Sequence, residues 1–275
     1  MSFSSKMKLF VFLAFALAAA NAVPTGINKP LKVMDMPKTP TIDGRITNGY
    51  PAYEGKVPYI VGLSFDGGWW CGGSIIGNTW VLTAGHCIND GSGVRIYYGA
   101  SFRHEAQYTH WVSGNDQIRH PNYNDQLNND IALIRTPHVD FWSLVNKVEL
   151  PSYNDRYNDY NGWWAVASGW GAISNGSGMH NYLNCVDVQI ISNDECRNVF
   201  GGGYVIDNTI CINTSGGKGT CNGDSGGPLV THDGSRIVGI TSFGHWDGCT
   251  AGQPAGFTRV TGYLDWIRDN TGISY

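Results

Sequence analysis

Short apolar runs alternate with clusters of glycine, asparagine and aspartate along most of this chain. The runs are rich in valine, isoleucine, tyrosine and tryptophan, a composition typical of β-strands bounded by turns. They cover Tyr59–Phe65, Ser74–Thr83, Val94–Gly99, Ile131–Arg135 and Trp163–Ser168. Helical periodicity is nearly absent, so the pattern predicts an all-β sandwich or barrel.

Two patterns near the C-terminus predict a hairpin and a helix. Leu229–His232 and Arg236–Phe243 flank the turn residues Asp233–Ser235, which predicts a β-hairpin. Behind Thr261, the expected N-cap, apolar residues recur at helical spacing and predict one terminal amphipathic helix. These residues are Tyr263, Leu264, Trp266 and Ile267.

The N-terminus has the organisation of a secretory signal peptide. Lys6 and Lys8 precede the apolar run Leu9–Ala20, and an A-x-A arrangement predicts cleavage after Ala22. A membrane anchor is the alternative. Twelve apolar residues span only about 18 Å at roughly 1.5 Å per residue, against a hydrocarbon core of about 30 Å. We therefore expect a secreted, extracellular protein without a membrane partner.

The remaining chain divides into a short pro-segment and one large unit. Val23–Arg45 is polar, dotted with prolines and free of cysteine, whereas Ile46–Tyr275 comprises 230 residues, enough for a single two-layered or two-barrel domain. The first 45 residues hold six of the 18 basic and two of the 22 acidic residues, so the mature chain has a net charge near −8. Such an acidic chain offers no basic patch for nucleic acid.

Seven cysteines in an exported chain predict disulfide bonds, although their number alone leaves the connectivity open. They are Cys71, Cys87, Cys185, Cys196, Cys211, Cys221 and Cys249. The tripeptides N-G-S at Asn175 and N-T-S at Asn213 are glycosylation sequons that fit export.

Three strings supply the parts of an acyl-transfer catalyst. TAGHC contains His86, NNDIALI contains Asp130 and GDSGGP contains Ser225. A serine hydroxyl needs a base to take its proton, and the base needs a third group to hold its tautomer. The amides of Gly223 and Ser225 can converge on a developing oxyanion. Separately, the strings could be a structural histidine, a turn cap and a glycine-rich turn; together they favour catalysis.

From Ile46 onward the chain resembles the trypsin/chymotrypsin-type serine proteases, and among them the Jonah-type digestive proteases of insects. The resemblance also rests on I-T-N-G at Ile46, C-G-G-S at Cys71, S-G-W-G at Ser168 and T-S-F-G at Thr241. It implies two six-stranded antiparallel β-barrels with the active site between them. It further implies disulfides Cys71–Cys87, Cys196–Cys211 and Cys221–Cys249. Cys185 is then a free, buried thiol, because Ala52 and Ala165 stand where some relatives carry further cysteines.

The resemblance also implies activation by proteolysis. D-G-R at Asp43–Arg45 precedes Ile46, and cutting after Arg45 would create an ammonium group on Ile46. Asp224 is the partner that the family provides for this ammonium. Their pairing would set the oxyanion-binding loop.

The residues expected to bind substrate are Gly219, Thr220, Ser242, Phe243, Gly244 and Ala255. The resemblance implies that Gly219 forms the base of the primary pocket, where no carboxylate stands to balance a lysine or arginine. We therefore expect Phe, Tyr, Leu or Met at P1, the substrate residue before the cut bond. Because this pocket is unsuited to Arg45, activation should need a separate trypsin-like protease.

No cofactor or metal is expected. The stretch from Ala100 to Trp111, where some relatives bind calcium, contains one carboxylate, Glu105, and zinc-ligand spacings are missing. We expect a monomeric digestive endopeptidase of the gut lumen, with protein and peptide substrates and proteinaceous inhibitors as partners. A regulatory cascade protease and a non-catalytic binding homologue are the alternatives. The intact triad weighs against the second.

Overall fold

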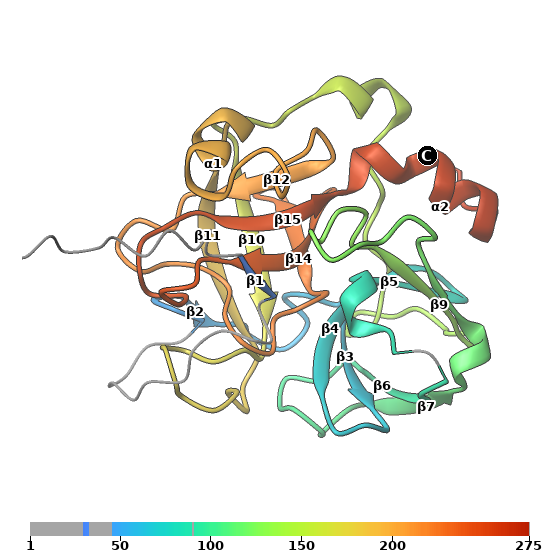
Figure 1. The fold of residues 1–275 in the computed structure, drawn as a ribbon. Helices are drawn as coiled ribbons and strands as arrows, with labels where there is room; N and C mark the ends of the chain where they lie inside the picture. The colour runs from blue at the N-terminus through green and yellow to red at the C-terminus, as the bar shows by residue number, and fades with distance from the viewer. Residues whose placement is uncertain (1–29, 33–45, 90, 275) are drawn as a thin grey trace, which may run out of the picture.

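Two antiparallel β-sheets contain most of the regular structure (Figure 1). The computed structural model describes residues 30–32, 46–89 and 91–274. The seven strands of the first sheet are, in spatial order, β7 (Tyr108–Val112), β6 (Val94–Tyr98), β3 (Ile60–Phe65), β4 (Trp70–Gly77), β5 (Trp80–Thr83), β9 (Ala132–Arg135) and β8 (Gln117–Arg119).

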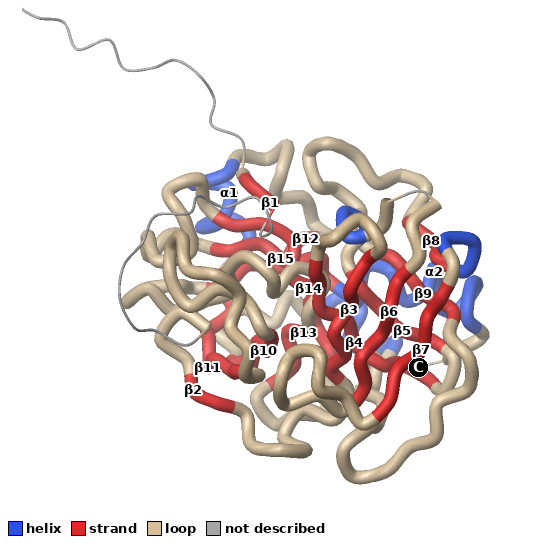
Figure 2. Tube along the Cα trace, turned by 90° about the horizontal axis from the view of Figure 1, so that it is seen from below, coloured by secondary structure: helices blue, strands red, loops and turns tan. Residues whose placement is uncertain are grey.

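The second sheet closes on itself. Six of its strands pair in a ring: β10 (Trp164–Gly169), β11 (Asn184–Ile191), β12 (Thr209–Ile212), β15 (Ala255–Arg259), β14 (Ile237–Gly244) and β13 (Pro228–Thr231). Two short strands attach to this ring: β1 (Leu31–Lys32) pairs with β14, and β2 (Tyr50–Pro51) pairs with β11. Figure 2 shows strands throughout the molecule and helices as short segments among them.

The all-β, two-barrel architecture is confirmed, with two differences in detail. The first sheet has seven strands rather than six, and its hydrogen-bonded order is open between β7 and β8 in the part of the chain that is described. The run Ser74–Thr83 belongs to two strands, because β4 ends at Gly77 and β5 starts at Trp80. The predicted hairpin around Asp233 is present as β13 and β14.

Hydrophobic alternation explains how individual strands are seated. In β6, Val94, Ile96 and Tyr98 are buried while Arg95 between them is exposed, as period-two alternation requires for a half-buried strand. In contrast, every residue of β14 is buried. Such a strand lies in the interior of the molecule. The C-terminal end of β14 contains Ser242, which belongs to the site described below.

Two α-helices accompany the sheets, α1 (Asn193–Phe200) and α2 (Leu264–Thr271). The sequence analysis predicted α2 and missed α1, although the Ser192 hydroxyl caps α1 by accepting from the Glu195 amide at 3.2 Å. Thr261 was wrongly expected to cap α2. It lies inside a 3₁₀ turn, Val260–Tyr263, that precedes the helix. No helix in the described ranges is long and apolar enough to cross a membrane.

Candidate active site

His86 lies in a 3₁₀ turn, Gly85–Cys87, immediately after β5. The Cys71–Cys87 disulfide ties this turn to β4, and the Thr83 hydroxyl donates to the Gly72 carbonyl at 2.8 Å. The histidine side chain is completely buried. The end of β5 and the disulfide therefore fix both the position of His86 and the wall behind it.

Asp130 precedes β9 and is fully buried. Its carboxylate accepts hydrogen bonds from the His86 amide at 2.7 Å, from His86 Nδ1 at 2.8 Å and from the Ser242 hydroxyl. Burial alone would raise the pKa of Asp130, but His86 and these hydrogen bonds outweigh burial and hold the pKa below its ordinary value. The carboxylate thus orients an imidazole from another segment and leaves Nε2 of His86 as its accepting nitrogen.

Ser225 lies in the loop before β13, beside the histidine turn. Its carbonyl accepts from the Gly72 amide at 2.7 Å. The next residue, Gly226, has a φ of +77°, and a Cβ there would lie 2.2 Å from the Thr83 hydroxyl. Only glycine permits this approach, so the loop that carries the serine rests directly on the end of β5.

Ser225, the candidate nucleophile, and His86, the candidate base, are both buried, and each has one polar side-chain atom without a partner among the described residues. Ser225 Oγ and His86 Nε2 have no hydrogen-bond partner among the described residues. A buried polar atom without a partner calls for an explanation, and a pair of reactive atoms that meet only during catalysis is one. The aspartate–histidine bond is therefore made in this uncut chain, whereas the histidine–serine bond is not.

Comparison with known proteins decides the family. A family model described as Trypsin matches residues 46–267. The chain is 68% identical to Serine protease 1 of Drosophila melanogaster over 274 residues, which are 98% of this chain and all of that protein. It is 38% identical to Collagenase of Hypoderma lineatum, over 98% of this chain and all of that one. A solved collagenase structure matches with a TM-score of 0.78 and 39% identity, covering 83% of this chain and 99% of the other.

The chain belongs to the trypsin family of serine proteases. It is a serine endopeptidase, a hydrolase that acts on peptide bonds of protein substrates. The resemblance to this family that the sequence motifs indicated is confirmed.

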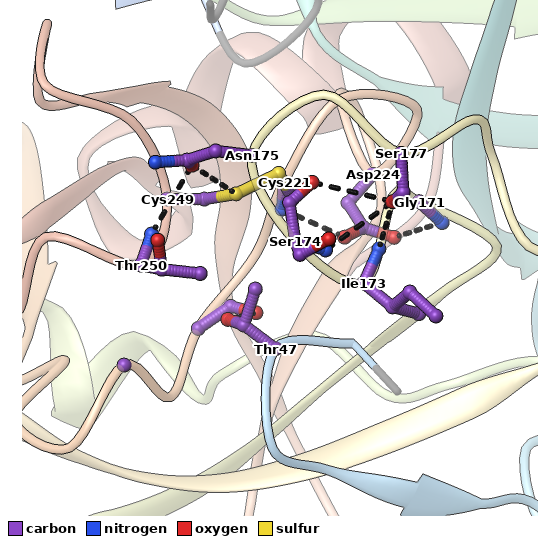
Figure 3. Close-up of a disulfide and its surroundings, with 12 residues drawn as sticks. Thr47, Gly171, Ile173, Ser174, Asn175, Ser177, Cys221, Asp224, Cys249 and Thr250 are labelled. Carbon is purple, nitrogen blue, oxygen red and sulfur yellow. Dashed lines mark hydrogen bonds between the residues drawn. A yellow bond between two sulfur atoms is a disulfide. The ribbon is translucent and has the colours of Figure 1, made fainter. Parts of the chain in front are cut away.

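In this protease a second aspartate, Asp224, is buried next to the nucleophile (Figure 3). Its carboxylate accepts from the amides of Gly171 at 2.8 Å and Cys221 at 2.9 Å. No cationic side chain of the described residues pairs with it, and burial raises its pKa to about 7 despite the two amides. A Cβ on Gly169 would lie 2.1 Å from this carboxylate, so the cavity holding Asp224 admits only glycine there.

The segment that follows the expected cleavage site is already seated in the protease. Ile46 is fully buried within the hydrophobic cluster of the second barrel. Thr47 is bonded to Gly219, the residue expected at the base of the primary pocket. Its hydroxyl donates to the Gly219 carbonyl at 3.0 Å, and its carbonyl accepts from the Gly219 amide at 3.3 Å. Arg45 and most of Val23–Arg45, like the signal sequence, lie outside the described residues.

The expected pocket residues come from three segments: Gly219 and Thr220 from the loop before Ser225, Ser242–Gly244 from the end of β14, and Ala255 from the start of β15. Thr220 is buried with its hydroxyl unpaired among the described residues, and Ala255 is buried at the start of β15. The ring of Phe243 does not stand free as a pocket wall. It is buried against Phe200, with ring centroids 5.2 Å apart, while its backbone pairs with Lys32. The side chains of Gly219, Thr220 and Ala255 carry no charge.

The sequence analysis assigned Ser242 to substrate binding only. The structure adds a second contact, the hydrogen bond from its hydroxyl to the Asp130 carboxylate. The T-S-F-G string contained no sign of this bond, because the two residues are 112 positions apart. Ser242 therefore connects β14, the strand expected to bind substrate, to Asp130.

The cysteines pair as Cys71–Cys87, Cys196–Cys211 and Cys221–Cys249, the pairs that the resemblance implied. Cys185 is free and buried, with its sulfur 3.3 Å from the Ser168 hydroxyl, and burial raises the pKa of its thiol. Cys71, His86 and Cys87 bring potential metal-binding atoms together. Two of these atoms form a disulfide and cannot act as thiolate ligands.

Proposed function

We propose that this chain is a secreted digestive endopeptidase of chymotrypsin-like specificity, made as a zymogen and activated by cleavage after Arg45. The observation that carries the proposal is the environment of the Ser225 loop. Gly219 and Thr220, the expected pocket base, bring no charge to the segment before Ser225, and the buried Asp224 carboxylate next to Ser225 pairs with no cationic side chain of the described residues.

Catalysis assigns one role to each triad residue. The Ser225 oxygen attacks the peptide carbonyl carbon while His86 Nε2 takes the hydroxyl proton. Asp130 stabilises the resulting imidazolium, and the amides of Gly223 and Ser225 receive the negative carbonyl oxygen. His86 then gives its proton to the leaving amine as the peptide bond breaks. Water, deprotonated by the same histidine, hydrolyses the acyl-enzyme.

Specificity follows from the pocket chemistry. A lysine or arginine side chain buried beside Gly219, Thr220 and Ala255 would lack a counter-charge, at a cost of several kcal/mol. An aromatic or long apolar side chain meets no such cost. Gly244 leaves the entrance open to a ring, and the Ala255 methyl group limits the depth. These features support cleavage after Phe, Tyr, Leu or Met.

A panel of peptide para-nitroanilides tests this specificity. The activated enzyme should cut the Phe and Leu substrates fastest, and fastest cutting of the Arg substrate would overturn the assignment. Gly219→Asp is the matched variant. A Cβ at this position would lie 3.1 Å from Thr214 Cγ2, so a slight shift accommodates the new carboxylate. The variant should gain activity on Arg and Lys and lose activity on Phe.

Activation supplies the cation that Asp224 lacks. Cleavage after Arg45 frees an ammonium group on Ile46, whose side chain is already buried. An ion pair with Asp224 would order the Gly223–Ser225 loop. Because the pocket disfavours arginine, a separate trypsin-like protease performs this cut. Purified precursor should stay uncut alone and be processed by added trypsin. Rapid processing of the precursor by itself would contradict this dependence.

The N-terminal segments and the relatives support the biological setting. The signal sequence supports secretion, and the short pro-segment without cysteines supports digestion rather than a regulated cascade. A relative named Collagenase makes collagen a reasonable substrate to include in assays. A fluorophosphonate probe that labels Ser225 after trypsin treatment would exclude a non-catalytic homologue. Failure to label would favour one.

A further inference from the structure

The substrate-side edge of β14 is covered by a piece of the pro-segment. β13 pairs with β14 only as far as Ile240, and Thr241 exchanges backbone hydrogen bonds with the loop residues Gly226 and Gly227 at 2.9 Å. Beyond Thr241 the edge is free for another strand. β1 occupies it, antiparallel, with Leu31 opposite Gly244 and Lys32 opposite Phe243 (Figure 1).

β1 runs along β14 toward Ser242, the residue that bonds to Asp130. From Leu31 to Lys32 the pro-segment passes from Gly244 to Phe243, and the next residue on β14 is Ser242, whose hydroxyl binds Asp130. Pro30 is buried, and Lys32 is half-buried. At the same time Ser225 is fully buried, and its Oγ and His86 Nε2 are withdrawn from solvent.

We infer that Pro30–Lys32 is the core of an intramolecular peptide inhibitor, which binds the β14 edge through its main chain where a substrate peptide would bind. Addition of a strand to an exposed sheet edge derives its affinity from backbone hydrogen bonds, so it does not require a particular side chain. The inference rests on the proposed pro-segment, and it adds a second cause of latency beside the unpaired Asp224.

Covalent attachment explains how so short a strand can be effective. A segment joined to its site has an effective concentration on the order of millimolar, so a dissociation constant of about 0.1 mM is enough to keep the edge filled in the uncut chain. Val23–Arg45 contains no cysteine, and nothing covalent retains it after cleavage at Arg45. Dilution then releases the inhibitor together with activation.

A synthetic peptide of Val23–Arg45 tests the inference on the trypsin-activated, purified full-length enzyme. Turnover of a Phe para-nitroanilide is measured first, then the peptide is added up to about 1 mM, the range set by the effective concentration. The expected result is competitive inhibition, with a raised KM and an unchanged kcat. Mass spectrometry of the reaction should recover the peptide uncut.

Two variant peptides provide the matched comparison. Leu31→Pro with Lys32→Pro removes both backbone donors of β1 and should weaken inhibition about tenfold, the expected effect of losing one or two hydrogen bonds. Thr25→Pro with Gly26→Pro adds the same number of prolines outside β1 and should inhibit like the natural peptide.

The outcomes separate this inference from the proposed function. If trypsin-activated protein does not turn over the Phe substrate, the proposed function is wrong. If it turns over and the natural peptide does not inhibit, the inference is wrong. Equal inhibition by the Leu31→Pro, Lys32→Pro peptide, or digestion of the natural peptide as fast as the chromogenic substrate, also overturns the inference.

Discussion

Asp130 and Asp224 are both fully buried residues of the candidate active site, yet their environments shift their pKa values in opposite directions. Asp130 is surrounded by His86 and the Ser242 hydroxyl, and its pKa is lowered. Among the described residues Asp224 accepts from two backbone amides, and burial raises its pKa to about 7. Burial is the largest single influence on both carboxylates, so their partners decide the sign.

The two aspartates differ in whether an ionisable side chain is already bonded to them in the uncut chain. On the first barrel, aspartate and histidine are already in catalytic contact in the uncut chain. On the second barrel, the serine loop contains a carboxylate that lacks its cation. Under the proposed zymogen mechanism, latency therefore lies in the serine loop, while the aspartate–histidine bond is already formed.

The largest effect is expected from Asp130→Asn in the activated enzyme. The amide cannot hold the imidazole tautomer that leaves Nε2 free to accept a proton, so kcat/KM should fall about 10⁴-fold. Steady-state kinetics on a Phe para-nitroanilide measures this loss. N-terminal sequencing should show Ile46 first, which ensures that activation itself is intact. A loss below tenfold would contradict the orienting role.

Asp224→Asn should cost less, since it removes a loop-ordering ion pair rather than a triad member. The expected loss in kcat/KM is about 10²- to 10³-fold, comparable with the loss of an oxyanion-hole donor. The pH dependence provides the control. The wild-type cut enzyme should lose activity as the Ile46 ammonium titrates, and the variant should show no such limb.

The uncut chain should lose stability between about pH 4 and pH 7. The folded-state pKa of Asp224, about 7, lies above its ordinary value of 3.8. The folded state therefore binds the proton more tightly, and that stabilisation disappears as pH rises through this window. The total is about 4 kcal/mol, at roughly 1.4 kcal/mol per pKa unit.

Urea unfolding at several pH values checks this sign. Arg45→Gln keeps the chain uncut, and the same chain with Asp224→Asn is the control. The variant should lack the Asp224 contribution to the slope of unfolding free energy against pH. Identical slopes for the two chains would mean that Asp224 has an ordinary pKa.

The smallest effect is expected from Ser242→Ala. Loss of one of three hydrogen bonds to Asp130 should lower kcat/KM about fivefold, equivalent to about 1 kcal/mol. Ser235→Ala, in the exposed β13–β14 turn, is the matched control and should change kcat/KM by less than about twofold. An effect of Ser242→Ala no larger than that of Ser235→Ala would show that this bond is dispensable.

The sequence predicted the barrel class and the residues of the triad because both depend on local strings. Alternating strands and the motifs around His86, Asp130 and Ser225 can be recognised within a few residues. The helix α1 was missed because its sequence contains only three apolar residues, Cys196, Val199 and Phe200, too few to show a clear helical period. The Ser242–Asp130 bond and the pairing of Leu31 with Gly244 join segments far apart in the chain. No local pattern encodes such contacts, and they emerge only from the folded arrangement.

The central claim is that an Ile46 ammonium paired with Asp224 makes Ser225 reactive. It is tested most directly by the rate at which a fluorophosphonate modifies Ser225, measured against pH before and after cleavage at Arg45. We predict slow modification of the uncut chain at every pH. After cleavage, modification should be fast. It should decline only at a pH where the Ile46 ammonium loses its proton, and pairing with Asp224 would raise the pKa of this ammonium above about 8. Equal rates for the cut and uncut chains, or a cut-chain rate that stays flat through that titration, would contradict the claim.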